Sequence, residues 1–150
     1  MSIAKRNERS LKAYGGIEKG QSHYHLIVGL HIAFFVSLLL EVLFIGARPA
    51  PWYWIPLGFF LLAQIIRVWA LTSLGVFWNT KIIVLPGADI VTKGPYKYVK
   101  HPNYLVVAVE ILTLPLIFQT YLTAIVFTVL NAVLILGVRI PEEERALRGV

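Results

Sequence analysis

Four long apolar stretches constrain this chain more than any other feature of its sequence. They run roughly from Tyr24 to Ala47, from Trp52 to Leu74, from Pro102 to Phe118 and from Tyr121 to Val138. Each is near the ~20 residues that a helix needs to cross the apolar core of a bilayer. Only 15% of the residues are charged, whereas a soluble domain carries about 25%. The sequence therefore predicts an all-α integral membrane protein with about four transmembrane helices.

The connections between these stretches predict how the helices follow one another. The segment RPAP (Arg48 to Pro51) predicts a turn between the first two. Only Gln119 and Thr120 separate the last two, which predicts a tight C-terminal helical hairpin. Pro115 predicts a kink near the outer end of the third stretch. We expect one membrane domain over residues 1–150, with a basic segment (1–22), a first helix pair (24–74), a loop (75–101), the helical hairpin (102–138) and a tail (139–150).

The basic residues predict the orientation of these helices in the membrane. Lysines and arginines gather in the N-terminal segment, in the loop 75–101 and in the tail, whereas the opposite side carries only Arg48. Because cytoplasmic loops are enriched in Lys and Arg, both termini and the loop are predicted to face the cytoplasm. The net charge of +6 then suits anionic membrane lipids, and we expect no nucleic-acid partner.

The loop 75–101 is long for a four-helix membrane protein, and connections of this length tend to be functional. Its segment KIIVLPGADIVTKG holds two β-branched runs, Ile82 to Val84 and Ile90 to Thr92, on either side of a Pro-Gly turn. This pattern predicts a small β-hairpin lying on the membrane surface.

Three charged residues lie within the apolar stretches, where an unpaired charge is costly. Arg67 and Glu110 lie at similar depths, about 12 Å from the cytoplasmic end at ~1.5 Å per residue. They are expected either to pair with one another or to line a polar substrate or cofactor cavity. Glu41 lies nearer the outer end, where it can reach head groups or pair locally.

The segment GPYKYVKHPNY (Gly94 to Tyr104) separates the second and third apolar stretches. A helical pattern follows His101 and Pro102, and proline suits the first position of a helix. His101 is then predicted to cap this helix, whose exposed N–H groups would bind an anion. Three tyrosines and two lysines could contact a ligand, or could merely anchor the segment at the lipid head groups (Tyr96, Tyr98, Tyr104, Lys97 and Lys100).

The tail segment RIPEEERAL (Arg139 to Leu147) places three acids directly after Pro141. The positive-inside rule does not explain acids on this side. They could favour a helix start through its dipole. They could also accept hydrogen bonds from a ribose, or offset a positive charge. With the anion site at the third helix, they would suit a ligand that carries a carboxylate, a ribose and a cationic centre.

These motifs resemble the isoprenylcysteine carboxyl methyltransferase family. The resemblance covers roughly residues 64–148 and rests on RVWALTSLGVFWNTKIIVLPGADIVTKGPYKYVKHPNYLVV followed by RIPEEERAL. The family's HPxY segment and Glu-Glu pair match positions of this chain in the same order (Lys100, His101, Pro102 and Tyr104, then Glu143 and Glu144). The N-terminal half, including IAKRNER and GQSHYHLIVGLH, is similar to a bacterial branch that O-methylates alkylpyrones made by type III polyketide synthases.

The resemblance implies an S-adenosylmethionine-dependent methyltransferase of a bacterial inner membrane, with its cofactor pocket on the cytoplasmic side. The matched residues Lys100, His101, Pro102, Tyr104, Glu143 and Glu144 would bind the cofactor. Glu143 and Arg139 would be catalytic, with Arg139 orienting an acidic acceptor. The acceptor would be a lipophilic small molecule that enters from the bilayer, and it is left open among an alkylpyrone, a prenylcysteine carboxylate, a phenol and an amine. A functional link to a polyketide synthase would follow from the first of these.

Two other functions are compatible with parts of the sequence. A small proton-coupled four-helix exporter could use Glu41, although the long inner loop argues against it. A non-enzymatic membrane scaffold would leave the HPxY segment and the Glu-Glu pair unexplained. His23, His25 and His31 are expected to be interfacial or core residues, and no metal site is predicted.

Overall fold

A computed structural model describes residues 3–19, 21–77, 79, 82–86 and 91–148. These described residues form six α-helices: α1 (Ile3–Ala13), α2 (Gln21–Ile45), α3 (Trp54–Leu74), α4 (Pro102–Ile117), α5 (Tyr121–Leu134) and α6 (Ile140–Arg148). The strands β1 (Ile17–Lys19) and β2 (Ile82–Val84) form a two-stranded sheet. Short 3₁₀ turns cover Gly75–Phe77 and Gly94–Lys97, and a π-helical turn covers Ile135–Arg139.

The apolar helices agree with the predicted membrane spans. In the described part of the chain, three helices are long and apolar enough to cross a bilayer, namely Tyr24–Ile45, Trp54–Phe77 and the continuous helix Tyr121–Arg148, and α4 is a shorter apolar helix. The apolar part of the last one ends before Arg139, so α6 is a polar extension of this helix. The prediction of an all-α membrane protein is confirmed.

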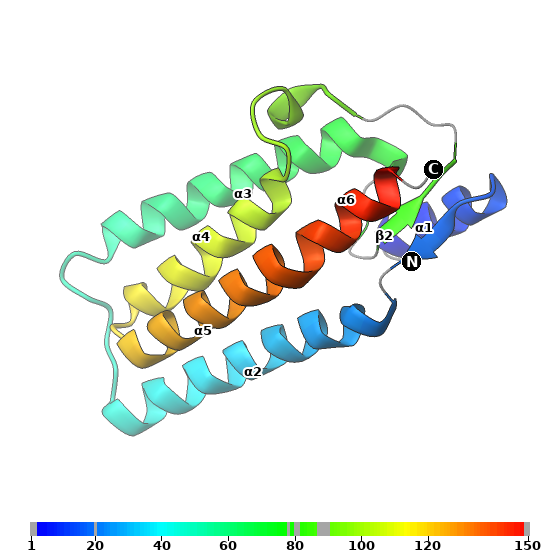
Figure 1. Cartoon of the computed structure of the whole chain (residues 1–150). Coiled ribbons are helices and arrows are strands. Elements are labelled where there is room, and N and C mark those ends of the chain that lie inside the picture. The colour runs from blue at the N-terminus through cyan, green and yellow to red at the C-terminus, as the bar shows by residue number, and fades with distance from the viewer. Residues whose placement is uncertain (1–2, 20, 78, 80–81, 87–90, 149–150) are drawn as a thin grey trace.

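The four apolar helices lie side by side in the order α3, α4, α5 and α2 (Figure 1). The consecutive helices α2 and α3 are therefore at opposite edges, and the C-terminal hairpin α4–α5 separates them. Phe34, Ile111 and Phe127 form the buried core between α2, α4 and α5. Many apolar side chains on the outer faces are exposed, as Phe44 and Leu43 are, because lipid tails take the place of a protein core.

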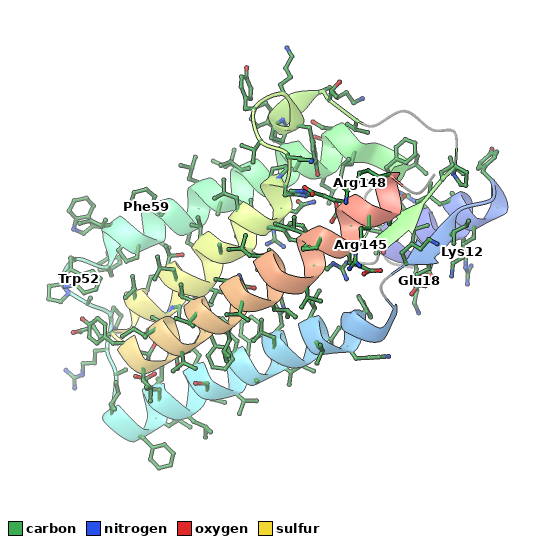
Figure 2. The ribbon with its side chains drawn as sticks, in the orientation of Figure 1. Lys12, Glu18, Trp52, Phe59, Arg145 and Arg148 are labelled. Atoms are coloured by element: carbon green, nitrogen blue, oxygen red, sulfur yellow. The ribbon has the colours of Figure 1, made fainter. Side chains whose placement is uncertain are left out.

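The two ends of the bundle differ in polarity. One end, here called the polar end, carries α1, the β-sheet and α6, and Figure 2 shows Lys12, Glu18, Arg145 and Arg148 there. Trp52 lies at the opposite end. This separation of charge suits a membrane protein whose polar end faces one aqueous side, as the distribution of Lys and Arg predicts.

The tight turn between α4 and α5 is present, and Glu41 explains part of its geometry. Thr120 N and Oγ1 both donate to Pro115 O, at 3.0 and 2.9 Å, which closes the turn. The Glu41 carboxylate of α2 accepts from Thr123 N at 2.8 Å and from Thr123 Oγ1 at 2.7 Å. Leu122 N donates to it more weakly, at 3.3 Å. Glu41 therefore caps the N-terminus of α5, where a negative charge is favoured.

The β-hairpin predicted within residues 75–101 is wrong in its pairing. Ile82–Val84 is a strand, but its antiparallel partner is Ile17–Lys19 from the N-terminal segment. Of the second predicted run, Val91 and Thr92 are not in a strand, and Ile90 lies outside the described residues. When two paired strands lie far apart in the chain, no tight turn joins them, so the sequence carries no turn signal that would predict their pairing.

The N-terminal segment is packed against the polar end. Asn7 of α1 is buried, and its Nδ2 donates to Gly75 O at 3.0 Å. Asn79 Nδ2 donates in turn to Ala4 O at 2.7 Å. These two hydrogen bonds from side-chain amides, together with the β1–β2 pairing, hold the N-terminal basic segment against the loop that leads to α4.

Arg67 and Glu110 form the structural pair that was one of the two predicted alternatives. Arg67 Nη2 on α3 donates to Glu110 Oε1 on α4, and Gln64 Nε2 donates to Glu110 Oε2 at 2.6 Å. The pair joins the two neighbouring helices within the membrane, where each charge needs a partner.

Candidate functional site

The loop that leads into α4 is fixed by close contacts with α3. Gly94 has φ +64°, and a Cβ atom there would overlap the Ser73 side chain. Glycine alone tolerates both conditions. Pro95 is buried within the 3₁₀ turn Gly94–Lys97, which leads the chain toward His101. The start of α4 is therefore anchored to α3 on one side and available to other elements on its other side.

His101 occupies the N-cap position of α4, but its ring does not cap the helix. The predicted cap position is confirmed, but the side chain makes no capping hydrogen bond, and His101 Nε2 instead lies 3.1 Å from Glu144 Oε1 on α6. Pro102 is buried at the first helical position, as predicted.

A polar cluster joins the start of α4 to α6. Lys100 Nζ lies 3.0 Å from Glu144 Oε1, so this carboxylate oxygen faces both Lys100 and His101. Tyr104 OH donates to Glu143 Oε2, and His101 Nδ1 lies 3.8 Å from Glu143 Oε1. The structure thus brings the predicted HPxY residues and the Glu-Glu pair into direct contact across two helices.

Arg139, on the π-helical turn, completes this cluster. Its side chain is buried, and its Nε donates to Tyr104 OH at 3.3 Å. The π-helical turn is defined by the bond from Ile140 N to Ile135 O, and such turns widen a helix and are frequent at functional sites. Helix Tyr121–Arg148 then continues through Pro141, so that Arg139, Glu143 and Glu144 lie on one unbroken element.

The charges of the cluster shift the pKa of groups beyond the membrane spans. Hydrogen bonds from His101 and then from Lys100 hold the pKa of Glu144 below its ordinary value. Burial, followed by the nearby Glu143 carboxylate, raises the pKa of Tyr96 to about 12. Asn103 Nδ2 donates to Tyr96 OH at 3.3 Å, which keeps this phenol beside the start of α4.

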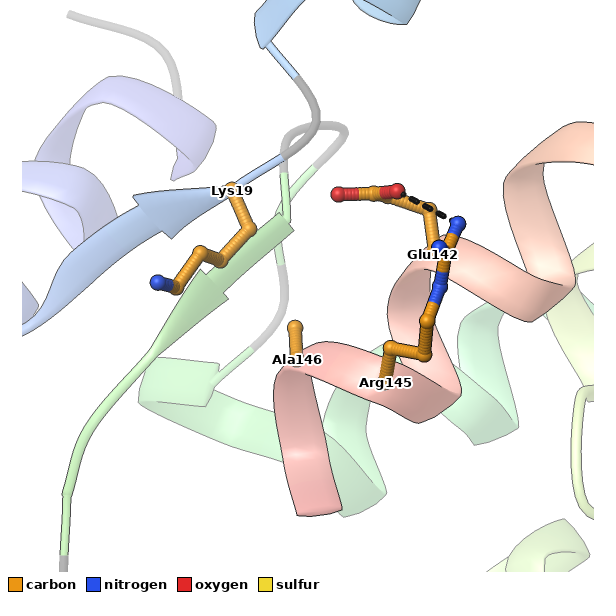
Figure 3. A pocket seen from close by; sticks show the side chains of 4 residues that line it. All are labelled: Lys19, Glu142, Arg145 and Ala146. Carbon is orange, nitrogen blue, oxygen red and sulfur yellow. Dashed lines mark hydrogen bonds and ion pairs between the residues drawn. The ribbon is translucent and has the colours of Figure 1, made fainter. Parts of the chain in front are cut away.

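Two cavities flank the cluster. One, of about 270 Å³, lies between α4 and helix Tyr121–Arg148, with His101 and Tyr104 at one end and Thr128 and Asn131 farther along. The other, of about 210 Å³, lies between β1 and the opposite side of α6 (Figure 3). Figure 3 shows Glu142 and Arg145, which are 3.0 Å apart, at the edge of this second cavity.

Sequence reasoning missed two contributors to these surfaces. The sequence suggests a role for the ring of Tyr96, whereas in the structure its hydroxyl accepts a hydrogen bond from Asn103. Asn131 is a buried carboxamide within an apolar helix, and its position in VLNAVL was a signal that could have been read. Tyr98 is exposed and lies against Trp69, away from the cluster.

The donor set of the cluster fits S-adenosylmethionine in its chemistry. Lys100, His101 and the start of α4 offer positive charge to a carboxylate. Glu143 and Glu144 offer acceptors to a ribose diol, or a negative charge to a sulfonium. These two halves contact each other directly, so the ligand would lie beside the cluster or separate its two halves.

Comparison with known proteins gives one family and two relatives. The model of the isoprenylcysteine carboxyl methyltransferase (ICMT) family matches residues 55–149, which include the whole polar cluster. The chain is 51% identical over 149 residues to "Uncharacterized protein YpbQ" of Bacillus subtilis, covering 99% of this chain and 88% of that protein. It is 32% identical over 148 residues to an uncharacterized protein of Haemophilus influenzae, covering 98% and 86%. No solved structure matches.

Proposed function

Because the chain belongs to the isoprenylcysteine carboxyl methyltransferase family, and is thus a membrane methyltransferase, we propose that it uses S-adenosylmethionine to methylate an oxygen of a lipophilic acceptor. The acceptor oxygen would belong to a hydroxyl, an enol or a carboxylate, as in an alkylpyrone or an isoprenoid-type compound. The observation that carries this proposal is the direct contact of Tyr104 and His101 with Glu143 and Glu144. Family membership alone implies the reaction class, whereas this contact supports a particular site for it.

In the proposed site the residues mainly bind and orient. Lys100, His101 and the start of α4 would bind the carboxylate of the donor, and Glu143 and Glu144 would bind its ribose or its cationic centre. When bound, S-adenosylmethionine supplies an electrophilic methyl group, whose bond to sulfur breaks as its bond to the acceptor oxygen forms and leaves a neutral thioether. Such an in-line displacement depends on positioning and on the exclusion of water.

Arg139 is proposed to orient the acceptor. It is buried where the apolar part of its helix ends, and it lies against Tyr104. A guanidinium at this level would attract the acidic oxygen of a molecule whose tail stays among the lipids. An acidic hydroxyl releases its proton readily and a carboxylate carries none, so little general-base assistance is required.

Two neighbouring acids of α6 provide a matched test. Glu143 contacts Tyr104, whereas Glu142 bonds to Arg145 on another side of the helix. We expect Glu143→Ala to abolish the binding of S-adenosylhomocysteine, measured by calorimetry on the detergent-solubilised protein, and Glu142→Ala to leave it unchanged. Transfer of a labelled methyl group to extracted lipids should be lost in the first variant only. Unchanged affinity in Glu143→Ala would refute the assignment.

A further inference from the structure

We propose that the cavity between α4 and helix Tyr121–Arg148 binds a long-chain acceptor that carries a second oxygen group within its apolar chain. Thr128 and Asn131 would hydrogen-bond this group, while the end of the molecule that is methylated lies near His101 and Tyr104. This inference rests on the proposed function, since the occupant is taken to be the methyl acceptor.

Two buried polar atoms, on residues that line the cavity, carry the inference. Asn131 is only 3% exposed, and its Oδ1 is buried. Thr128 Oγ1 is buried as well, and within the described part of the chain neither atom has a hydrogen-bond partner. Both residues line the same cavity of about 270 Å³. A buried polar group without a partner is unfavourable, and the cost is greatest where no water is available.

The other threonines of the membrane helices show that Thr128 is unusual. A helical threonine ordinarily satisfies its hydroxyl by bonding to a carbonyl of the preceding turn. Thr113 Oγ1 does so with Val109 O at 2.7 Å, and Thr72 Oγ1 does so with Val68 O at 2.9 Å. The Thr128 hydroxyl makes no such bond to the described residues, so a residue that lines the cavity keeps a hydroxyl without a partner.

The rest of the lining suits a hydrocarbon chain. Apart from the polar residues at its two ends, the cavity is lined by apolar side chains of α4 and of helix Tyr121–Arg148. Leu105 and Leu136 are 49% and 68% exposed, so the cavity borders the lipid-facing surface. A lipid-soluble molecule could reach it from the bilayer without crossing water.

The spacing of the polar residues defines the ligand. Asn131 precedes Arg139 by eight residues on one helix, which corresponds to roughly 12 Å along the axis. A molecule with its reactive oxygen near Tyr104 would therefore need its second oxygen several carbons along the chain. A plain hydrocarbon tail would leave the Asn131 and Thr128 atoms unsatisfied, whereas a hydroxyl or carbonyl in the chain would pair with them.

The inference can be tested with a pair of saturated fatty acids of equal length, one of which carries a hydroxyl in the middle of its chain. Their dissociation constants would be measured by competition against a fluorescent fatty acid, using the full chain in lipid nanodiscs. The variants are Asn131→Leu and Thr128→Val, which keep size and shape. Thr113→Val is the matched control, because Thr113 lies on α4, does not line the cavity and bonds to its own helix.

We expect the unsubstituted protein to bind the hydroxylated fatty acid about tenfold more tightly than the plain one, as one or two hydrogen bonds allow. Asn131→Leu and Thr128→Val should each reduce this preference severalfold, and their combination should remove it. Thr113→Val should keep it. The variants should unfold at an unchanged or higher temperature, because each removes an unpaired polar group from an apolar site.

Equal affinity of the unsubstituted protein for both fatty acids would overturn the inference, and so would a preference that persists in the double variant. In either case Asn131 and Thr128 would not be the residues that recognise the hydroxyl group. Failure of the proposed function would look different. The same nanodiscs would then show no binding of S-adenosylhomocysteine by calorimetry, whether or not the hydroxylated fatty acid is preferred.

Discussion

Replacing Glu41 by glutamine separates a structural role for this residue from a role in proton transport. Glu41 is the acid that a four-helix exporter would use. In the structure its Oε1 accepts from both the amide and the hydroxyl of Thr123, at 2.8 and 2.7 Å, and its Oε2 faces Leu122 N at 3.3 Å. The carboxylate is thus committed to the first turn of α5.

The size of the effect follows from these contacts. Glutamine keeps one acceptor oxygen, which can retain the two bonds from Thr123, but it loses the negative charge at the helix N-terminus. That charge contributes about 0.3–1 kcal/mol, and up to ~2 kcal/mol in partly buried settings. The NH₂ group of glutamine would also face Leu122 N, and because both groups are hydrogen-bond donors, this contact is unfavourable. We expect the free energy of unfolding to fall by about 1–2 kcal/mol in Glu41→Gln and by about 2–4 kcal/mol in Glu41→Leu, which removes every acceptor.

Thermal unfolding in detergent measures this directly. For a chain of this length, 1 kcal/mol corresponds to about 2–4 °C in Tm. Ser37→Ala is the control with a smaller expected effect. Ser37 Oγ lies 2.8 Å from Thr123 Oγ1, so this variant removes a hydrogen bond to the Thr123 hydroxyl and leaves the Glu41 carboxylate in place. It should lower Tm less than Glu41→Gln does. An unchanged Tm in Glu41→Gln, together with loss of a proton-coupled transport activity, would refute the capping role and favour the exporter.

Two further outcomes are expected from the ion pairs. Arg67→Met should destabilise the protein by about 3 kcal/mol, because it strands the Glu110 carboxylate in the membrane, and Arg67→Met combined with Glu110→Leu should recover most of this loss in thermal unfolding. A double variant less stable than the single one would contradict this. The pKa of Glu144 lies below its ordinary value of 4.5, so the stability from its ionised form is fully present above about pH 4.5 and is lost as pH falls through the lowered pKa. The Tm difference between the unsubstituted protein and Glu144→Gln should therefore shrink in acid, and a constant difference down to about pH 3 would contradict that.

The membrane helices were predictable because hydropathy and length alone define them. The turn at Gln119 and Thr120 and the pair Arg67–Glu110 were predictable for related reasons, since a two-residue gap forces a hairpin and a charge in a membrane demands a partner. The side-by-side order of the helices was not. Nothing in the apolar stretches says that the C-terminal hairpin lies between α2 and α3, because lipid and protein satisfy the same apolar surface.

The sequence indicated which residues form the polar cluster, but it did not indicate how they are arranged. The order of the motifs indicated Tyr104, His101, Glu143 and Glu144. The sequence predicted that the first two and the last two would contact opposite parts of one ligand. The structure has them in direct contact. The strand Ile17–Lys19 was missed because three residues give too short a pattern, and the π-helical turn was missed because no residue type demands it.

That π-helical turn changes the direction in which the side chains after it face around the helix axis. An α-helix advances about 100° per residue, so a turn that contains one additional residue rotates everything after it by that amount relative to everything before it. Residues up to Leu134 keep the rotation that suits lipid and the neighbouring helices, whereas Glu143 and Glu144 are turned toward His101 and Tyr104. Deleting one residue between Ile135 and Arg139 would leave the membrane-embedded part in place and swing both acids away from the start of α4. In this chain the length of a five-residue turn, as much as the identity of the acids, sets the direction in which the acids face.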